Sequence, residues 1–345
     1  MDPLTHSVLG MAIAMLVTRQ PERRRQAALA GLASGLLPDA DVFLRSASDP
    51  LFNLEYHRHF THSLIFSPVI ALFGACIASS LYAVFKKRID WKMLLLPAWL
   101  AGLSHIFCDI WTSYGTRMWW PFSNQRVALD WISVIDPLFT VPLAACTALA
   151  LRYANKKAAA AGLIWGLVYL SFCVTQQHRA KAALTGWLAQ QNLPAAERLS
   201  VRPSFGNVLF WRGMAVHGGV CRVVAIRCGW PGDIQLSPGQ SSPLFASPEA
   251  AIAGFSVPAD SVQARDIARF YHFSDGWIGR FPGKPDILGD LRYATVPDEI
   301  KPLWGIRLTP EDAGRHVDFL TFRDGGAPSI DRLWNMMKGT AKPLN

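Results

Sequence analysis

Four long apolar segments in the first half of the chain limit its possible folds more than any other feature. Each is apolar enough, and nearly long enough, to cross a bilayer as a helix. They cover residues 64–85, 93–111, 134–151 and 159–177. Two shorter apolar stretches, 7–18 and 26–37, precede them. Hydrophobic residues make up 51% of the chain and charged residues 17%. We therefore predict a mainly α fold, a polytopic membrane helical bundle with four clear spans plus two short N-terminal apolar helices.

The second half of the chain has a different pattern. Residues 182–192 have the pattern of an amphipathic helix, and five short stretches resemble strands separated by Gly, Pro, Asp and Ser. These stretches are 206–212, 219–227, 288–293, 303–308 and 316–322. We predict a membrane-embedded domain at 1–178 and a smaller soluble α+β domain at 179–345. Cys221 and Cys228 flank one predicted strand, and the sequence leaves open whether they form a disulfide.

Basic residues gather in three short turns between the apolar segments, within a net charge of +9. They are Arg19, Arg23, Arg24 and Arg25, then Lys86, Lys87, Arg88 and Lys92, then Arg152, Lys156 and Lys157. The positive-inside rule makes these turns cytoplasmic in a multi-pass protein of a bacterial inner membrane. The other ends of the apolar segments and the C-terminal domain then face the periplasm. No basic stripe with interleaved aromatic residues occurs, so we predict no nucleic-acid partner.

Residue types that bind metals lie at those periplasmic ends. They are His6, Asp39, Asp41, His57, His62, His105, Asp109 and Asp136. His105 and Asp109 are four residues apart, so one helix face presents both side chains. Imidazoles and carboxylates without cysteine suit a divalent ion, zinc first and manganese second, and argue against a thiolate structural site. The sequence therefore predicts a metal site at the periplasmic rim of the bundle, with the number of ions left open.

Such a site indicates hydrolysis by a metal-activated water, because a bound metal lowers the pKa of coordinated water toward neutrality. Arg58 offers a planar fork suited to phosphate, and Thr61 adds a donor at the start of the next helix. These residues favour a phosphoester substrate, either a small molecule or a lipid. We expect Asp39 or Asp41 to bridge metals or to accept the proton. We expect Thr112 and Asp136 near the substrate.

The motifs that carry these residues are similar to those of a known family. They are Thr5-His6, Leu37-Pro38-Asp39-Ala40-Asp41, His57-Arg58-x-x-Thr61-His62-Ser63 and His105-x-x-x-Asp109. Over residues 1 to about 140 the chain resembles the YdjM family of membrane-bound, predicted metal-dependent hydrolases, also described as LexA-binding inner-membrane proteins. That family distantly resembles zinc-dependent phospholipase C and P1-type nucleases. The resemblance implies that His6, Asp39, Asp41, His57, His62, His105 and Asp109 are metal ligands or close neighbours of the ligands.

Two other functions remain open alongside the leading hypothesis of a membrane-bound metal-dependent hydrolase. One is a metal or proton transporter that uses the same His and Asp residues as a permeation site. The other is a regulatory membrane protein with a structural metal, whose C-terminal domain binds a protein partner. Asp136, which precedes Pro137, also suits the N-cap of a helix. Arg58 also suits an ion pair with Glu55 or with a lipid headgroup. We expect His59, His178, His217, His272 and His316 to lie outside the site.

Overall fold

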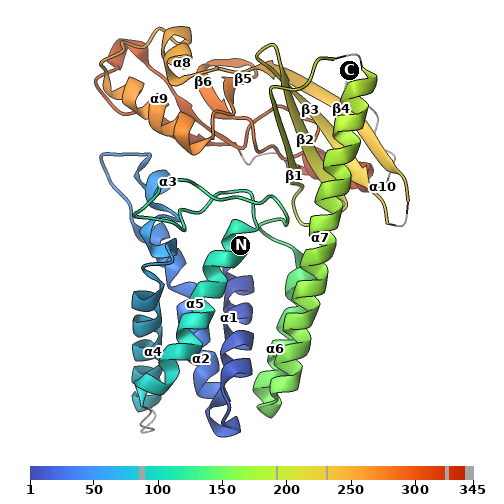
Figure 1. Ribbon diagram of the computed structural model, residues 1–345. Coiled ribbons are helices and arrows are strands. Elements are labelled where there is room, and N and C mark those ends of the chain that lie inside the picture. Colours follow the sequence, from blue (N-terminus) through green and yellow to red (C-terminus); the bar gives the residue numbers. More distant parts are fainter. Residues whose placement is uncertain (85–89, 192, 231, 323–325, 339–345) are drawn as a thin grey trace. The chain divides into compact units, whose positions relative to one another are not determined.

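The chain divides into two compact units, which are described separately here (Figure 1). A computed structural model describes residues 1–84, 90–191, 193–230, 232–322 and 326–338. The first unit contains Met1–Leu44, Tyr56–Thr175 and Phe205–Asn207. The second contains Arg45–Glu55, Gln176–Ser204 and Val208–Asn345. The second unit thus includes an eleven-residue segment, 45–55, that lies inside the predicted membrane-embedded domain in the sequence.

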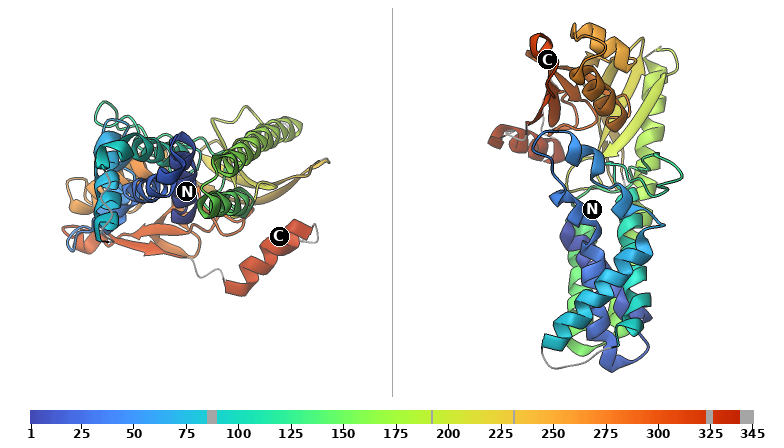
Figure 2. Two further views of the ribbon diagram at one scale, coloured as in Figure 1. Left: turned by 90° about the horizontal axis from the view of Figure 1, so that it is seen from below. Right: turned by 90° about the vertical axis from the view of Figure 1, so that its left-hand side faces the viewer.

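The first unit is a helical bundle, and its helices run side by side in both views of Figure 2. It is built from α1 (Pro3–Val17), α2 (Arg24–Leu36), α4 (Ser67–Val84), α5 (Leu95–Ile110), α6 (Pro137–Tyr153) and the first part of α7 (Lys156–Gln190). Two 3₁₀ segments, η2 (Pro38–Phe43) and η3 (Phe60–His62), follow α2 and precede α4. Helices α1, α2, α4 and α5 pack on one another, and α6 packs on α1. The two short predicted helices correspond to α1 and α2, which confirms them.

Three segments of the described residues are long and apolar enough to cross a membrane, whereas we predicted four. They are Ser67–Val84, Trp91–Ile110 and Lys156–Gln190. The prediction of a span at 134–151 was wrong. Helix α6 begins only at Pro137, because Asp136 caps it, and Arg152 lies in its last turn. Its uncharged length is therefore shorter than the apolar segment suggested. The predicted helix at 182–192 is the end of α7, which continues unbroken to Gln190.

Glycines on α1 and α2 allow the two helices to approach very closely. A Cβ atom added to Gly10 would lie 2.5 Å from the carbonyl oxygen of Gly31, and one added to Gly35 would lie 2.6 Å from that of His6. Gly31 and Gly35 are four residues apart, the spacing that brings the backbones of membrane helices together. This packing holds the first turn of α1, which carries His6, against the last turn of α2.

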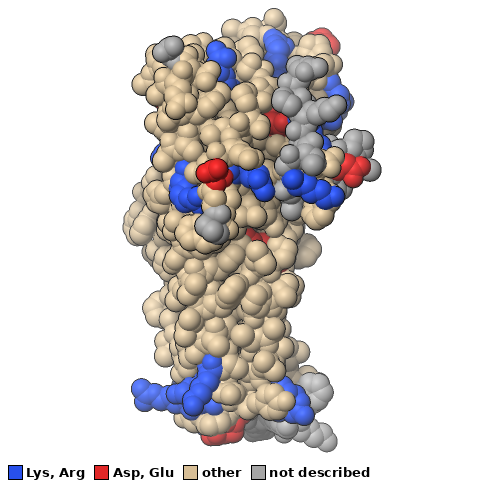
Figure 3. Space-filling view, turned by 90° about the vertical axis from the view of Figure 1, so that its right-hand side faces the viewer, with Lys and Arg blue, Asp and Glu red and all other residues tan. Residues whose placement is uncertain are grey.

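Two of the three basic turns lie at the same end of the bundle. Arg24 donates to the carbonyl oxygen of Ala154 at 2.7 Å, and Arg25 donates to that of Leu151 at 3.0 Å. In Figure 3, Lys and Arg side chains gather at one end of the helical unit, and its surface is nearly uncharged along the helices above them. Lys86, Lys87 and Arg88 lie outside the described residues. The described basic side chains of these turns thus lie together at one end of the helical unit.

Within its described residues, the second unit contains two antiparallel sheets of four strands, each in sequence order. The first consists of β1 (Arg198–Pro203), β2 (Phe210–His217), β3 (Val220–Cys228) and β4 (Ile234–Pro243). The second consists of β5 (Ile278–Phe281), β6 (Lys284–Asp290), β7 (Trp304–Arg307) and β8 (Asp318–Thr321). Helices α8 (Pro248–Gly254) and α9 (Val262–Phe273) connect the sheets, and α10 (Gly326–Lys338) follows them. The prediction of an α+β domain is confirmed, although three strands were missed.

The two cysteines of this unit do not form a disulfide. Cys221 and Cys228 are both free and buried. Both lie on β3, seven residues apart in an extended strand, which separates their Cα atoms by about 23 Å. Disulfide formation requires Cα atoms within about 7 Å. The question that the sequence left open is therefore answered by the position of both residues on one strand.

Candidate metal centre

The predicted ligands come from four separate stretches of the chain and meet at one end of the helical unit. His6 lies in the first turn of α1, and Asp39 and Asp41 lie in η2 after the end of α2. His62 ends η3, and His105 and Asp109 lie near the end of α5. Pro38 ends α2 and begins η2, because proline cannot donate the next helical hydrogen bond. The chain therefore turns away from the axis of α2 just before Asp39 and Asp41.

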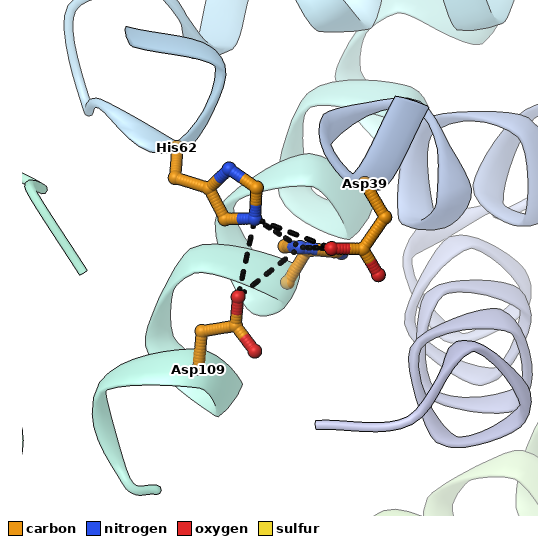
Figure 4. Close-up of side chains that lie close together, drawn as sticks. Asp39, His62 and Asp109 are labelled. Carbon is orange, nitrogen blue, oxygen red and sulfur yellow. Dashed lines mark hydrogen bonds and ion pairs between the residues drawn. The ribbon is translucent and has the colours of Figure 1, made fainter. Parts of the chain in front are cut away.

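Four of these residues form a group whose donor atoms lie within 4.8 Å of one another: Asp39, His62, His105 and Asp109. Figure 4 shows Asp39, His62 and Asp109 pointing toward one another from three different segments. Nε2 of His62 lies 3.4 Å from Oδ1 of Asp39 and 3.2 Å from Oδ2 of Asp109. Nε2 of His105 lies 3.6 Å and 3.4 Å from the same two oxygens. The two Nε2 atoms are 3.0 Å apart.

These distances match the spacing of donor atoms around a small divalent ion. Four donors that bind an ion tetrahedrally at about 2.0–2.1 Å lie about 3.3 Å from one another. The five distances above range from 3.0 to 3.6 Å. The side chains of His62, His105 and Asp109 are fully buried, and that of Asp39 is 19% exposed. The group could thus hold a metal ion with one side turned toward solvent or substrate.

Hydrogen bonds behind each imidazole direct its other nitrogen into the group. Nδ1 of His105 lies 2.7 Å from the carbonyl oxygen of Gly35, which can only accept a hydrogen bond. Nδ1 of His62 lies 3.2 Å from Oδ2 of Asp41 and 3.0 Å from Oγ1 of Thr61. Both rings therefore use Nδ1 as the donor. Their Nε2 lone pairs face the carboxylates, as in metal sites where a second contact fixes each histidine.

Several buried polar side-chain atoms near the group have no hydrogen-bond partner among the described residues. They are Oδ2 of Asp109 and both ring nitrogens of His6. The His6 ring stacks on that of His105 with centroids 3.6 Å apart, and its Nε2 lies 3.2 Å from Oδ1 of Asp109. Buried polar atoms without partners are costly and uncommon. A cation among these atoms would satisfy Oδ2 of Asp109 directly, so the residues fit a metal ion.

Asp41 contacts its neighbours through both carboxylate oxygens. Oδ1 lies 2.7 Å from Nδ1 of His57, and Oδ2 accepts hydrogen bonds from the backbone of Arg58 at 2.9 Å and from Thr61 at 2.8 Å. Asp41 also belongs with Asp39 and His57 to a second group of possible ligands, in which its oxygens already have these partners. The contacts of Asp41 thus fix His57 and His62. Asp39 is shared by both groups.

Arg58 lies beside Asp109 and has a strained backbone. Its φ is 60°, a left-handed conformation that is uncommon for a side chain of this kind. The backbone N–H bond to Asp41 holds that conformation. The guanidinium is buried and contacts Oδ1 of Asp109 at 3.0 Å and Oγ1 of Thr112 at 3.0 Å. It also lies over the ring of Tyr114, 5.0 Å from its centroid. The alternative that Arg58 pairs with Glu55 is not met, since Arg58 pairs with Asp109 and Glu55 with Arg269.

The excess of carboxylates shifts the titration of the groups outside the spans. Burial acts to lower the pKa of His62, but the adjacent carboxylates of Asp109, Asp39 and Asp41 overcome this and raise it to about 10. Burial acts to raise the pKa of Asp39, but its hydrogen bond to His62 and the nearby His105 hold it below the usual range. The centre thus attracts positive charge, from a proton or from a metal ion.

Asp136 has contacts elsewhere. It caps α6 by accepting from the backbone N–H of Leu138 at 3.1 Å and of Phe139 at 3.3 Å, and it accepts from the hydroxyl of Tyr169 at 3.0 Å. These contacts match the N-cap alternative, and none of them involves the His/Asp group. Thr112 contacts Arg58, as described above. Of the histidines expected outside the site, His316 contacts Asp266 at 2.8 Å in the second unit.

Two features of the centre were not expected from the sequence. One is the carbonyl oxygen of Gly35 as partner of His105, which the Gly31-x-x-x-Gly35 spacing could have indicated. The other is the contact of Arg58 with Asp109. It could not be expected, because these residues are 51 positions apart and no local pattern links them. A third group of acids and histidine, Asp49, Asp266 and His316, lies in the second unit. Arg269 bridges its two aspartates, so it is an ion-pair network.

Comparison with known proteins relates the helical half of the chain to a protein family. The model of the family described as YdjM inner membrane protein matches residues 1–180, more than half of the chain. YfhP of Bacillus subtilis (strain 168) is 33% identical over 161 residues, 45% of this chain and 47% of that protein. Inner membrane protein YbcI of Escherichia coli (strain K12) is 34% identical over 108 residues, 30% of this chain and 57% of that protein.

The chain therefore spans about half the length of these relatives. No solved structure matches it significantly. The family match covers every residue of the two possible ligand groups of the helical unit. The motifs that suggested the resemblance thus lie inside the matched region. The chain belongs to the YdjM family of inner membrane proteins.

Proposed function

We propose that this membrane protein is a metal-dependent hydrolase that cleaves phosphoesters. The observation that carries the proposal is the group of Asp39, His62, His105 and Asp109, whose donor spacing suits a small divalent ion. Imidazole and carboxylate donors without thiolate favour zinc, with manganese as the next candidate. A bound ion supplies Lewis acidity toward water and toward a phosphoryl oxygen. The protein's own residues then have to bind, orient and neutralise the substrate.

Asp39 and Arg58 are the residues that we assign to the substrate side. The Asp39 carboxylate is the exposed member of the donor group, so a water molecule reaches the centre past it, and it is placed to accept a proton from that water. Arg58 keeps one donor in reserve, because its buried Nε has no hydrogen-bond partner among the described residues. A planar guanidinium with a free N–H is suited to bind a phosphoryl oxygen. Thr112 holds that guanidinium in place.

Asp41 and Thr61 act through the histidines in this proposal. Because both oxygens of Asp41 already have partners, we assign it to orienting His62 and His57, with Thr61 supporting the same carboxylate. His57, whose side chain is 23% exposed, remains available as a ligand to a second ion together with Asp39. The number of ions is thus one at the main group, or two if the Asp39 carboxylate bridges. His6 completes the surroundings of Asp109 as a neighbour or ligand.

We further propose that the centre lies on the periplasmic side of the inner membrane, together with the second unit. The basic turns lie at the end of the helical unit opposite to η2 and η3, which supports this orientation. A substrate of an enzyme at this rim would reach it from the periplasm or from the outer leaflet. We also propose that the second unit binds a protein partner. The chain carries no feature that we assign to nucleic-acid binding.

The proposal is tested by turnover of the purified full chain in detergent or nanodiscs. Soluble phosphomonoesters, soluble phosphodiesters and phospholipids are assayed with and without added zinc, and after treatment with a chelator. We expect zinc-dependent release of phosphate or alcohol that falls to background in His62→Ala and Asp39→Asn. The matched controls are His178→Ala and Asp260→Asn, which replace exposed residues and should retain wild-type turnover.

Other outcomes would favour the alternative functions. Bound zinc with ion flux into sealed vesicles and no turnover on any substrate would contradict the hydrolase and support a transporter. Bound zinc with neither activity, and a coordination shell made only of protein atoms, would support a structural metal in a regulatory protein.

A further inference from the structure

An open cavity of about 800 Å³ lies directly beside the metal centre, within the helical unit. Its polar lining consists of Asp39, His57 and Arg58, together with Asp2 and Tyr114. The rest of its lining is strongly apolar and includes Leu36, Val42, Phe43, Ile77, Val134 and Ile135. The cavity therefore has a charged end at the residues that we assign to phosphate and an apolar region that no polar substrate would need.

The apolar lining is open to the surroundings of the helices. The side chain of Phe43 is 80% exposed, and those of Val42, Ile77, Val134 and Ile135 are each more than a third exposed. Ile77 lies on α4, one of the segments long and apolar enough to cross a membrane. In a membrane protein such side chains face hydrocarbon, since water would make their exposure costly. Exposed apolar side chains thus surround the opening of the cavity, and one of them, Ile77, lies in a candidate span.

We infer that the substrate is an amphiphile, a phosphoester whose hydrocarbon chain lies in this cavity while its phosphate meets Arg58 and the metal centre. This inference rests on the proposed function and names its substrate class. A hydrocarbon chain in the bilayer enters the cavity without leaving apolar surroundings, so the step costs little. A soluble phosphoester gains nothing from the apolar wall. The geometry therefore selects substrates already anchored in the membrane.

The test uses the full chain in nanodiscs with a photoreactive probe, phosphatidic acid that carries a diazirine on its acyl chain. After irradiation, we expect labelled peptides from residues 33–43 and 134–135. Ala33→Phe places an aromatic ring in the cavity from α2, and Ile77→Trp narrows the cavity from α4. Each substitution should reduce this labelling about tenfold, which corresponds to a loss of about 1.4 kcal/mol in binding free energy. Ala148→Phe, at an exposed position of α6 outside the cavity, is the matched control and should label as the wild type does.

Competition separates a lipid from free phosphate. Dodecylphosphonate should suppress the labelling, whereas inorganic phosphate at the same concentration should not. Equal labelling of the wild type and both narrowed variants would overturn the inference. It would also be overturned if the protein hydrolysed soluble phosphoesters and this turnover were inhibited by inorganic phosphate but not by dodecylphosphonate. If labelling behaves as expected but no phosphoester is hydrolysed, the hydrolase proposal fails and the lipid site remains.

A second inference comes from the segment between two residues of the centre. Asp41 and His57 contact each other at 2.7 Å, and the chain between them includes Arg45–Glu55, which belongs to the second unit. Leu51 is 1% exposed and packs in that unit's core with Ile267 and Phe270 of α9. Segment 45–55 thus packs within the second unit, and Asp41 and His57 lie on either side of it in the chain.

Arg269 of α9 binds the same segment on both sides of Leu51. Its guanidinium contacts Oδ2 of Asp49 and Oε2 of Glu55, each at 2.8 Å. It also contacts Asp266 on its own helix at 3.0 Å. One cation thus holds three carboxylates, two of them from the loop that joins Asp41 to His57. We propose that Arg269 is a positioning residue, which fixes segment 45–55 and thereby restrains Asp41 and His57 on either side of that segment in the chain.

Metal affinity tests this role without reference to turnover. The full chain is titrated with cobalt(II), whose visible absorption reports on the ligands around it. Arg269→Met should weaken cobalt binding about tenfold and change the spectrum, and Arg269→Lys should restore part of the affinity. The control is Arg315→Met, which removes an exposed ion pair of the same unit with Asp312. Faster cleavage by protease within segment 45–55 would show that Arg269→Met has released this segment. If cobalt affinity and spectrum nevertheless stayed as in the wild type, the proposal would be overturned.

Discussion

Nε2 of His62 and Nε2 of His105 lie 3.0 Å apart, although the residues are 43 positions apart in the chain. Each ring uses its other nitrogen for a contact behind it, His105 with the Gly35 carbonyl and His62 with Asp41 and Thr61. Two nitrogen lone pairs that face each other at this distance repel unless a proton or a metal ion lies between them. This histidine pair and the carboxylates of Asp39 and Asp109 beside it make up the group that could hold a metal ion.

Because Asp41 orients the histidines, its replacement should weaken metal binding without abolishing it. Asp41→Asn keeps the size of the side chain but turns one acceptor into a donor, so a contact to His57, Arg58 or Thr61 is lost. Residues that orient metal-binding histidines typically contribute 10- to 100-fold to affinity. We expect zinc affinity to fall by about that factor in a competition titration with a chelating dye. Asp233→Asn, which is exposed, should not change it, and complete loss of binding would show that Asp41 is itself an indispensable ligand.

The close packing of α1 on α2 predicts a large cost for a single methyl group. A Cβ atom at position 31 would lie 2.3 Å from the Gly10 carbonyl oxygen, so Gly31→Ala must push the helices apart. Overpacking of this kind costs about 1–3 kcal/mol. We expect a clearly lower unfolding temperature in detergent. Gly186→Ala has no atom within 4 Å of the added carbon and should leave stability unchanged or slightly raised. Equal unfolding temperatures in both variants would contradict the described packing.

Much of the centre could be predicted because its residues lie in short motifs at the ends of apolar segments. The alternation of the segments was enough to bring His6, Asp39, His62 and Asp109 to one end of the bundle. The separate roles of Asp39 and Asp41 could not be predicted, since both are acids two residues apart. Only their surroundings distinguish them. Thr61 and the backbone of Arg58 contact Asp41, whereas Asp39 is left with the histidines.

Other parts of the fold depended on contacts that no local pattern records. The apolar segment 134–151 looked like a span, but Asp136 and Arg152 set the ends of α6 closer together. Strands β1, β4 and β5 were missed because their sequences lack regular alternation; β4 contains Pro238 and Gly239. The place of segment 45–55 in the second unit could not be predicted, because its partners on α9 lie more than 200 positions away.

The pair of Asp49 with Arg269 predicts how stability depends on pH. Partial burial acts to raise the pKa of Asp49, but hydrogen bonding to Arg269 holds it below its usual value. A carboxylate whose pKa is lowered on folding stabilises the protein above its unfolded pKa, about 3.9, and loses that contribution as the pH falls through the folded value. Asp49→Asn should thus unfold at a lower temperature than wild type at pH 7, and the difference should shrink below about pH 4. A difference that grows on acidification would contradict this pairing.

The proposed orientation predicts which fusions of a periplasm-dependent phosphatase are active. Fusions after Gln125, in the loop between α5 and α6, and after Ser200, in β1, should be active. A fusion after Asn155, in the basic turn between α6 and α7, should be inactive, because that turn is assigned to the cytoplasm. Protein levels measured by immunoblot serve as the control. The reverse pattern would place the metal centre in the cytoplasm, while leaving its geometry unaffected.

The most direct test is X-ray absorption at the zinc edge of the purified full chain, combined with metal analysis. The account predicts about one or two zinc ions per chain, surrounded by nitrogen and oxygen atoms at about 2.0–2.1 Å, and loss of this signal in His62→Ala and His105→Ala but not in His178→Ala. A sulfur-rich shell, or the same metal content in all three variants as in wild type, would contradict it.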